Sequence, residues 1–305
     1  MRALQFHEYG PADVLRVEDI PAPHPGPGEI RIAVRASGVT PADHRIRSGE
    51  FRHLLPVTFP HTLGIDAAGV VDEIGAGVTG VRTGDAVFGL TDLAKLGGAN
   101  AEYAVLALWA AKPEALSWEQ AGGAAGNTET SGRVLDLLRI TEGDTLLIEG
   151  AAGGVGSLAV QLAVARGARV IGTASPRNHD FLAGLGAEPV SYGPGLAGRV
   201  GGPVDAVFDC AGSGSLGDLV ALAGGPDRVV TIADFHAAEH GVRQSRTAGP
   251  GADPQSRTAL GVAARLAGQG RFTVPVAGVF PLAEAAAAHR LSETGHARGK
   301  VVLTP

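Results

Sequence analysis

Seven residues between an apolar strand and an amphipathic helix have the composition of a nucleotide-binding loop. The loop Gly150-Ala151-Ala152-Gly153-Gly154-Val155-Gly156 follows the apolar run 146–149 and opens a helix predicted over 154–166. Its small residues let the backbone approach a pyrophosphate, and the free amides at a helix N-terminus attract anionic oxygens. The alternative is a glycine turn that serves packing alone. We predict dinucleotide binding by Ala151, Gly153, Gly154, Val155 and Gly156.

The end of the next predicted strand indicates which dinucleotide binds. An Asp or Glu about 20 residues after the loop would hold a ribose 2′-hydroxyl and repel a 2′-phosphate. The sequence there is Ile171-Gly172-Thr173-Ala174-Ser175-Pro176-Arg177, which contains no acid. Ser175 can donate a hydrogen bond and Arg177 brings charge to a phosphate, although Arg177 also fits an ordinary exposed loop. The pattern favours NADPH over NADH.

Composition and charge argue against several other classes of partner. The 305 residues are 45% hydrophobic and 18% charged, which is typical of a compact globular protein of two domains. The net charge of -6, with scattered Lys and Arg, offers no basic surface for nucleic acid. The N-terminal residues are too polar for a signal sequence, and no apolar run approaches the roughly 20 residues that cross a bilayer. We expect no membrane association and a cytoplasmic location.

Cysteine usage limits the metal chemistry open to the chain. Cys210 is the single cysteine, so one chain can form neither a disulfide nor a thiolate-rich metal site. Its place just after a predicted strand favours a small buried side chain over a nucleophile. The histidines at 7, 24, 236, 240 and 289 have no spacing typical of a metal site, and we interpret them as solvated or core-edge residues.

The elements that must position these residues fall into two regions. The first hundred residues predict short strands separated by turns, at 3–6, 30–35, 68–74, 85–88 and 102–106. Ser117 and Gln120 then have the spacing of a capping box. Beyond it, apolar strands at 145–149, 169–173, 205–209 and 228–232 alternate with helices at 154–166, 176–185 and 214–223. Strands that are apolar on both faces and alternate with helices indicate a parallel, doubly wound sheet.

The remaining chain predicts a helix over 255–268, a helix over 281–292 and a final strand over 300–303. We therefore expect an irregular β region followed by an α/β region, with short elements at the C-terminal end.

Five segments carry a common pattern: 38–49, 63–71, the loop 150–156, 186–192 and the tail 295–303. Together they resemble the zinc-independent, NADPH:quinone oxidoreductase-like branch of the medium-chain dehydrogenase/reductase superfamily. The resemblance implies an α/β fold with a GroES-like irregular β-barrel catalytic domain (1–113 and 270–305) and a doubly wound Rossmann domain (114–269). It also implies a homodimer, with cofactor and substrate held between the two domains.

The positions that bind zinc in other members of the superfamily differ here. Those members use a Cys in the first segment and Gly-His-Glu in the second, which gives an open metal site. The matching residues of this chain are Thr40 and Gly64-Ile65-Asp66. We therefore predict that no metal is bound and that Asp66 has a structural part.

The resemblance also suggests four candidate catalytic residues. Thr40 stands where the branch usually has Asn, so it either hydrogen-bonds substrate or nicotinamide ribose, or merely terminates a strand. Asp43 matches the family's Asp, which organises the cleft, although a turn-forming carboxylate is equally compatible. Arg45 replaces a frequent Tyr, which leaves His44 and Arg45 as alternative donors, whereas a histidine on a polar loop is more often solvated.

Three more cofactor contacts follow from the resemblance. Tyr192 matches a Tyr that lies against the adenosine phosphate in relatives. Thr130, in Thr128-Glu129-Thr130, resembles the family's Gly-x-Thr contact, with Thr in place of the Gly. Lys300 follows Gly299 as in the family tail and approaches the cofactor, or else is a strand-start lysine that faces solvent.

These observations favour an NADPH-dependent, zinc-independent enzyme that reduces quinones or α,β-unsaturated carbonyl compounds by hydride transfer. A conjugated acceptor can hold negative charge without a metal, so the protein need only orient it and donate a hydrogen bond. A pathway-specific enoyl reductase and a non-catalytic NADPH-binding protein are the two alternatives. Activity with NADPH and a quinone or 2-alkenal distinguishes an enzyme from a binding protein.

Overall fold

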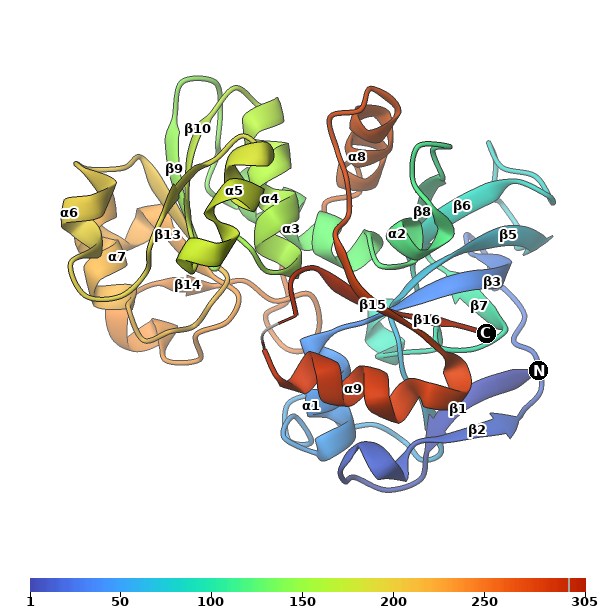
Figure 1. Ribbon diagram of the computed structural model, residues 1–305. Helices are drawn as coiled ribbons and strands as arrows, with labels where there is room; N and C mark the ends of the chain where they lie inside the picture. Colours follow the sequence, from blue (N-terminus) through green and yellow to red (C-terminus); the bar gives the residue numbers. More distant parts are fainter. Residues whose placement is uncertain (296) are drawn as a thin grey trace. The chain divides into compact units, whose positions relative to one another are not determined.

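The computed structural model describes residues 1–295 and 297–305 (Figure 1), which form two compact units. The first unit comprises Met1–Asn127, Ala248–Gly251 and Leu260–Pro305, and the second comprises Thr128–Thr247 and Ala252–Ala259. The first unit thus continues past the boundary expected at 113/114 and resumes before the one expected at 269/270. His296, in the tail segment that resembles the family, lies outside the described residues.

The first unit consists mainly of β-strands in two sheets. The larger has the order β15-β16-β3-β5-β6-β8, with β7 also paired to β3, and the smaller has the order β2-β1-β4. The strands are β1 (Arg2–Phe6), β2 (Arg16–Asp19), β3 (Ile30–Val39), β4 (His61–Thr62), β5 (Asp66–Ile74), β6 (Ala86–Leu90), β7 (Tyr103–Leu106), β8 (Leu108–Ala111), β15 (Val276–Pro281) and β16 (Lys300–Thr304).

Strand β3 is the centre of the larger sheet. Its alternating Ile30, Ile32 and Val34 are buried in one apolar cluster with residues of β5, β6 and β7, as expected for a strand with one face on the core. At its other end, residues 37–39 pair with residues 301–303 of β16. The C-terminal strand therefore completes a sheet that is otherwise formed mostly by the first third of the chain.

The helices of the first unit are short. They are α1 (Pro41–Ser48), α2 (Trp118–Gly122), α9 (Ala285–Glu293) and the 3-10 turns η1 (Ala12–Val14), η2 (Leu93–Lys95) and η6 (Leu282–Glu284). The capping box predicted at the start of α2 is confirmed, with Ser117 and Gln120 bonded in both directions. A Cβ at Gly122 would lie 2.6 Å from Ala36 Cβ. This close approach of α2 to β3 explains why the first unit extends beyond residue 113.

The second unit is a parallel sheet of six strands with the order β11-β10-β9-β12-β13-β14. They are β9 (Thr145–Glu149), β10 (Arg169–Thr173), β11 (Glu188–Val190), β12 (Ala206–Asp209), β13 (Val229–Thr231) and β14 (Arg243–Gln244). In order along the chain this is 3-2-1-4-5-6, so the predicted doubly wound unit is confirmed. From β9 the chain adds β10 and β11 on one side and then β12, β13 and β14 on the other, so the strand order switches between β9 and β12.

The helices of the second unit connect its strands. They are α4 (Gly154–Ala165), α5 (His179–Gly184), α6 (Leu196–Val200) and α7 (Leu216–Ala223), with 3-10 turns η3 (Pro176–Asn178), η4 (Pro226–Arg228) and η5 (Ala237–His240). Two further helices, α3 (Ala125–Leu137) and α8 (Ala259–Gly268), have residues in both units. Among the described residues, no helix has the length and apolarity needed to cross a bilayer.

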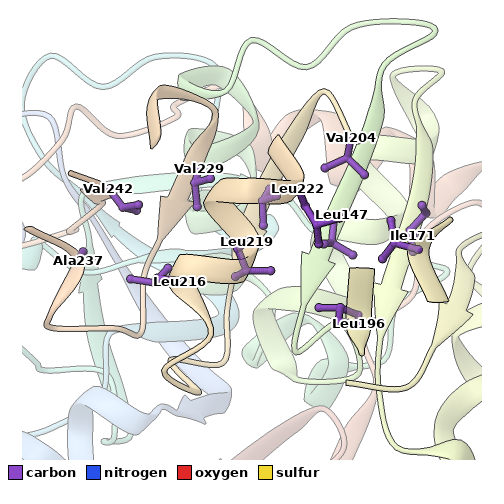
Figure 2. Close-up of a cluster of buried hydrophobic side chains, with 12 residues drawn as sticks. Leu147, Ile171, Leu196, Val204, Leu216, Leu219, Leu222, Val229, Ala237 and Val242 are labelled. Atoms are coloured by element: carbon purple, nitrogen blue, oxygen red, sulfur yellow. The ribbon is translucent and has the colours of Figure 1, made fainter. Parts of the chain in front are cut away.

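One apolar cluster holds α6 and α7 on the sheet (Figure 2). Leu216, Leu219 and Leu222 recur every three residues on one face of α7 and are buried with Leu147 and Val229 of the strands. This cluster covers one face of the sheet.

Candidate functional site

The glycine loop leads directly from β9 into α4. Gly150 has a left-handed φ of 73°, and the amides of Gly150 and Ala151 donate to the side chain and the carbonyl of Thr173, each at 3.1 Å. A Cβ at Gly156 would lie 2.7 Å from Ala151 Cα. Only glycine therefore lets the first turn of α4 lie against the loop.

The first turn of α4 offers amides to an anion. The N-cap residue Gly153 has no side chain and gives no capping hydrogen bond, and the first amides of a helix have no acceptor within it. Val155 and its neighbours thus expose backbone donors at the carboxyl edge of a parallel sheet. Such an arrangement suits a phosphate or pyrophosphate.

Two buried carboxylates lie at the point where the strand order switches between β9 and β12. Glu149 and Asp209 end the neighbouring strands β9 and β12 in register. Glu149 accepts from Ser213 Oγ (3.0 Å) and Ser215 Oγ (2.5 Å), and burial raises its pKa. Asp209 accepts from the amides of Ala211 and Gly212 at 2.8 and 3.0 Å. Sequence reasoning missed both acids, which fix the loop after β12.

The end of β10 carries donors and no carboxylate. Ser175 is half-buried and Arg177 is exposed. Arg177 forms no hydrogen bond or ion pair with any other described residue, so its guanidinium is available to a ligand. The chemistry of this edge fits a phosphate monoester better than a ribose hydroxyl.

Two threonines of α3 differ in whether their hydroxyls are occupied. Thr130 Oγ1 accepts from Arg133 Nη2 at 3.3 Å and lies 3.5 Å from Glu129 Oε2. Thr128 Oγ1 is fully buried and has no hydrogen-bond partner among the described residues. Ser131, one turn after Thr128, donates to the Val155 carbonyl at 3.2 Å, which brings this face of α3 to the start of α4.

Thr128 is therefore a candidate contact that sequence reasoning missed. A sequence signal was present, because Gly126-Asn127-Thr128 has the Gly-x-Thr spacing that Thr128-Glu129-Thr130 lacks. The orphaned hydroxyl of Thr128 and the uncapped turn of α4 together fit a nicotinamide dinucleotide. The proposed role of Thr130 stays a prediction.

Lys300 is buried in the first unit. Its Nζ donates to Asp66 Oδ2 at 3.0 Å, and Asp66 Oδ1 accepts from the Gly126 amide at 2.6 Å. The Lys300 side chain is 4% exposed and that of Asp66 is 0% exposed. The alternative of a solvent-facing lysine is therefore wrong, because the ammonium neutralises a buried carboxylate. A cofactor contact by Lys300 stays a prediction.

Thr40 and Asp43 form the cap of α1. The Asp43 carboxylate accepts from Thr40 N (2.6 Å) and Thr40 Oγ1 (2.7 Å), and its other oxygen accepts from Gly64 N (3.1 Å). Burial raises the pKa of Asp43. Thr40 thus caps the helix where β3 ends, and Asp43 ties that cap to the segment before β5. Because the Thr40 hydroxyl donates to Asp43, it is left as an acceptor toward any ligand.

His44 and Arg45 lie on α1, so the polar loop expected around His44 is wrong; the Thr40 cap starts a helix there. Arg45 Nε lies 3.6 Å from Glu50 Oε1, and its guanidinium lies 5.5 Å from the centre of the Phe51 ring. His44 is half-buried with no hydrogen-bond partner among the described residues, and burial lowers its pKa. A neutral His44 can still donate or accept one hydrogen bond.

The same helix faces a buried histidine. Sequence analysis interpreted His289 as solvated or at the core edge, which is wrong: it is 0% exposed, because α9 packs over α1. Both ring nitrogens of His289 and two nitrogens of Arg47 are buried without partners among the described residues. Arg47 pairs with Glu293 through Nη2.

The described residues contain no group of three His, Cys, Asp or Glu side chains close enough to hold a metal ion. The matching acid, Asp66, is engaged by Lys300 and by a backbone amide. Burial raises the pKa of Cys210 well above that of a free thiol, so its thiol stays protonated.

The predicted site residues divide between the two units. The loop residues 151–156, Thr130, Ser175, Arg177 and Tyr192 belong to the second unit, and Thr40, Asp43, His44, Arg45 and Lys300 belong to the first. In the second unit, Thr173 bonds the loop to the end of β10, which brings the loop and Ser175 to one edge of the sheet. Tyr192 follows the neighbouring strand and is 60% exposed.

Two family models match the chain. "Alcohol dehydrogenase GroES-like domain" matches residues 26–114, and "Zinc-binding dehydrogenase" matches residues 185–303. The first model falls in the β-rich unit, which confirms the GroES-like part of the predicted fold. The second covers strands β11 to β14 of the parallel sheet and continues into the C-terminal part of the first unit.

Similar proteins cover the whole chain. A quinone oxidoreductase of Sus scrofa is 31% identical over 99% of this chain and 97% of its own length. An NADPH-dependent alkenal/one oxidoreductase, chloroplastic, of Arabidopsis thaliana is 30% identical over 100% of this chain and 80% of its own. The solved quinone oxidoreductase of Coxiella burnetii has a TM-score of 0.84 and 32% identity, and the match covers 100% of this chain and 99% of that one.

The two family models, the full-length relatives and the doubly wound sheet agree with one another. This chain belongs to the quinone oxidoreductase-like branch of the medium-chain dehydrogenase/reductase superfamily and is an oxidoreductase.

Proposed function

We propose that this oxidoreductase uses NADPH to reduce quinones or α,β-unsaturated carbonyl compounds and that it needs no metal ion. The observation that carries the proposal is the uncapped N-terminus of α4 beside a β10 end that has Ser175 and Arg177 and no acid. The names of two relatives, a quinone oxidoreductase and an NADPH-dependent alkenal/one oxidoreductase, support the cofactor and substrate class.

The second unit binds the cofactor in this proposal. NADPH, when bound, supplies a hydride from C4 of its nicotinamide ring. The amides of Gly154, Val155 and Gly156 hold the pyrophosphate. Ser175 and Arg177 hold the 2′-phosphate, which NADH lacks, and the Thr128 hydroxyl gains the hydrogen bond that it otherwise lacks.

The first unit supplies donors in place of a metal. Thr40 and Ile65 replace the ligands of the zinc-dependent members, and Lys300 neutralises Asp66, which supports the absence of zinc from the reaction. When a quinone or enone accepts a hydride, the negative charge that forms is delocalised onto the carbonyl oxygen. One hydrogen bond to that oxygen is therefore enough to stabilise the charge. His44 is the better donor to that oxygen, because Arg45 lies beside Glu50.

A homodimer and a cytoplasmic location are also part of the proposal. Size-exclusion chromatography with light scattering tests the first, and cell fractionation tests the second. Neither bears on the cofactor assignment.

The direct test is an absorbance assay with NADPH and a panel of acceptors that includes 1,4-benzoquinone and a 2-alkenal. We expect oxidation of NADPH that persists after treatment with a strong chelator. Loss of activity on chelation contradicts the metal-free part. No turnover with any acceptor, despite tight NADPH binding, favours a binding protein.

Arg177→Ala tests the choice of cofactor. We expect KM for NADPH to rise roughly tenfold, because one charge-assisted hydrogen bond of about 1.5–3 kcal/mol is lost, with little change for NADH. Arg169→Ala, which removes an exposed arginine paired with Glu188, is the control. Equal losses with both nucleotides contradict the assigned role of Arg177.

A further inference from the structure

The loop between β11 and α6 carries an exposed aromatic ring beside the proposed phosphate site. Val190 at the end of β11 pairs with Thr173 at the end of β10, and the Ala174 amide donates to the Val190 carbonyl at 3.0 Å. The segments 174–177 and 191–195 therefore leave the sheet side by side. Tyr192 in the second segment is 60% exposed, so its ring is open to stack on a flat partner beside the proposed phosphate site.

A single guanidinium holds this loop. Arg199 of α6 donates from Nε to Ser191 O (2.8 Å) and from Nη1 to Pro194 O (2.9 Å). Its Nη2 donates to Tyr192 O (3.2 Å) and Gly193 O (2.8 Å). Four consecutive carbonyls thus converge on one side chain, and four of the five N–H donors of an arginine are used.

The loop would be flexible without this side chain. Gly193 and Gly195 have left-handed φ values of 91° and 80°, and glycines lose the most conformational freedom when they are fixed. Helix α6 itself is held by Leu196 and Val200, which are buried in the cluster around Leu147; Figure 2 shows Leu196 in this cluster. Arg199 therefore connects a helix fixed on the core to a loop that has little else to fix it.

We infer that Arg199 is a positioning residue for the adenosine-phosphate end of NADPH. It sets the backbone beneath Tyr192 before the nucleotide arrives, so the ring does not have to be ordered on binding. The inference rests on the proposed use of NADPH. The planar, forked guanidinium of Arg199 is what positions the loop, because its N–H groups donate to backbone carbonyls. The positive charge alone does not do this, so lysine cannot replace Arg199.

Three variants test the inference: Arg199→Lys, Arg199→Met and Tyr192→Ala, with Arg169→Lys as a control on the same sheet. The measurements are Kd for NADPH and for adenosine 2′,5′-bisphosphate, and KM and kcat with one quinone. We expect both Arg199 variants to weaken both ligands about three- to tenfold, which corresponds to the ordering of one or two side chains or loop residues. kcat should stay unchanged, since hydride transfer occurs at the other end of the cofactor.

A double variant adds a test of coupling. Arg199→Lys in the Tyr192→Ala background should weaken NADPH binding less than it does in the parent, because both changes act through the same ring. Full additivity overturns the inference, as does wild-type affinity in Arg199→Lys, which would assign the effect to charge. A fall in kcat at constant KM also overturns it.

The outcome distinguishes this inference from the proposed function. If the parent protein binds neither NADPH nor adenosine 2′,5′-bisphosphate, the proposed cofactor fails and the inference fails with it. If the parent binds both and the Arg199 variants bind them equally well, only the inference fails.

Discussion

At the scale of single residues, the threonine hydroxyls around the proposed site differ in whether they already form hydrogen bonds within the protein. The Thr40 hydroxyl donates to Asp43, and the Thr130 hydroxyl accepts from Arg133, whereas the Thr128 hydroxyl has no partner among the described residues. A buried hydroxyl without a partner costs about 1–3 kcal/mol. A ligand that reaches Thr128 recovers that free energy, so this residue gains more from binding than its neighbours do.

Gly156 should tolerate no side chain. A Cβ there would lie 2.7 Å from Ala151 Cα, so Gly156→Ala must push α4 away from the loop. We expect the free energy of unfolding to fall by about 1–3 kcal/mol and NADPH binding to weaken at least tenfold. Gly184→Ala is the control, because a Cβ at Gly184 would meet none of the described atoms within 4 Å. Denaturant titration and NADPH fluorescence measure both, and normal binding by Gly156→Ala contradicts the packing argument.

His289 should make the protein less stable in acid. Burial, followed by the charges of Arg47 and His44, lowers its pKa to about 3. Below about pH 6.5 the unfolded chain binds a proton that the folded protein does not, so stability falls as the pH drops toward 3, by up to about 1.4 kcal/mol per unit. The stabilisation is fully present above about pH 6.5.

His289→Leu should flatten that dependence. We expect the difference in unfolding free energy between pH 7 and pH 5 to shrink by about 1–2 kcal/mol in the variant. His44 and His61 also have pKa values lowered by burial, so a residual slope remains. If the dependence of the unfolding free energy on pH is the same in the variant, whatever its stability at pH 7, then His289 does not have the lowered pKa that its burial predicts.

Sequence spacing selects candidate site residues that are close in the chain and misses contacts that depend on distant partners. The loop at 150–156 and the end of β10 were identified from glycine spacing and the absence of acid. The burial of Lys300 was not, because its partner Asp66 is far away in the chain. Thr128 was passed over for Thr130 although Gly126-Asn127-Thr128 has the Gly-x-Thr spacing, and the structure adds that the Thr128 hydroxyl is the one without a partner among the described residues.

At the scale of elements, a buried network attaches α3 to the segment after β14. Arg133 donates from Nε to Glu129 Oε1 at 3.0 Å and from Nη1 to Ser245 Oγ. Ser245 in turn donates to Asp253 at 2.6 Å, and the Ser256 amide donates to Glu129 at 3.1 Å. The side chains of Glu129 and Arg133 are almost fully buried, so neither charge can turn to water.

Arg133→Met should therefore be severely destabilising. The variant keeps the aliphatic stem and leaves the Glu129 carboxylate buried and unpaired, which costs about 3–5 kcal/mol. Arg166→Met removes the partly exposed pair with Asp136 and should change stability by no more than about 1 kcal/mol. Chemical denaturation of both variants measures the difference, and similar losses contradict the role of burial.

The elements also differ in how far their sequences defined them. Strands β9 and β10 have the predicted bounds, because continuous apolar runs between helices have few alternatives. Helix α1 was not predicted, since Pro41-Ala42-Asp43-His44-Arg45 lacks an apolar stripe; its cap and its packing against α9 create it. The two-residue strands β4 and β14 are too short to show a sequence pattern, because only their pairing with neighbouring strands defines them.

At the scale of the whole molecule, both ends of the sequence enter one unit. Lys300 fixes the C-terminal strand through its ion pair with Asp66 of β5. Lys300→Met should lower the unfolding free energy by about 3–5 kcal/mol, because the carboxylate stays buried without its cation. Adding Asp66→Asn should recover part of the loss, and Lys95→Met, at an exposed pair with Glu29, should have little effect. Thermal and denaturant unfolding of the parent, the two single variants and the double variant measure this order of stability.

Residues 37–39 of β3 pair with β16, so this part of the larger sheet can form only after the last strand has been synthesised. The ribosome adds residues from β7 to β16 over roughly 10–40 s at about 5–20 residues per second. Throughout that interval the second unit is translated, and the end of β3 has no β16 partner. Until β16 is made, residues 37–39 present a strand edge that can pair with another chain.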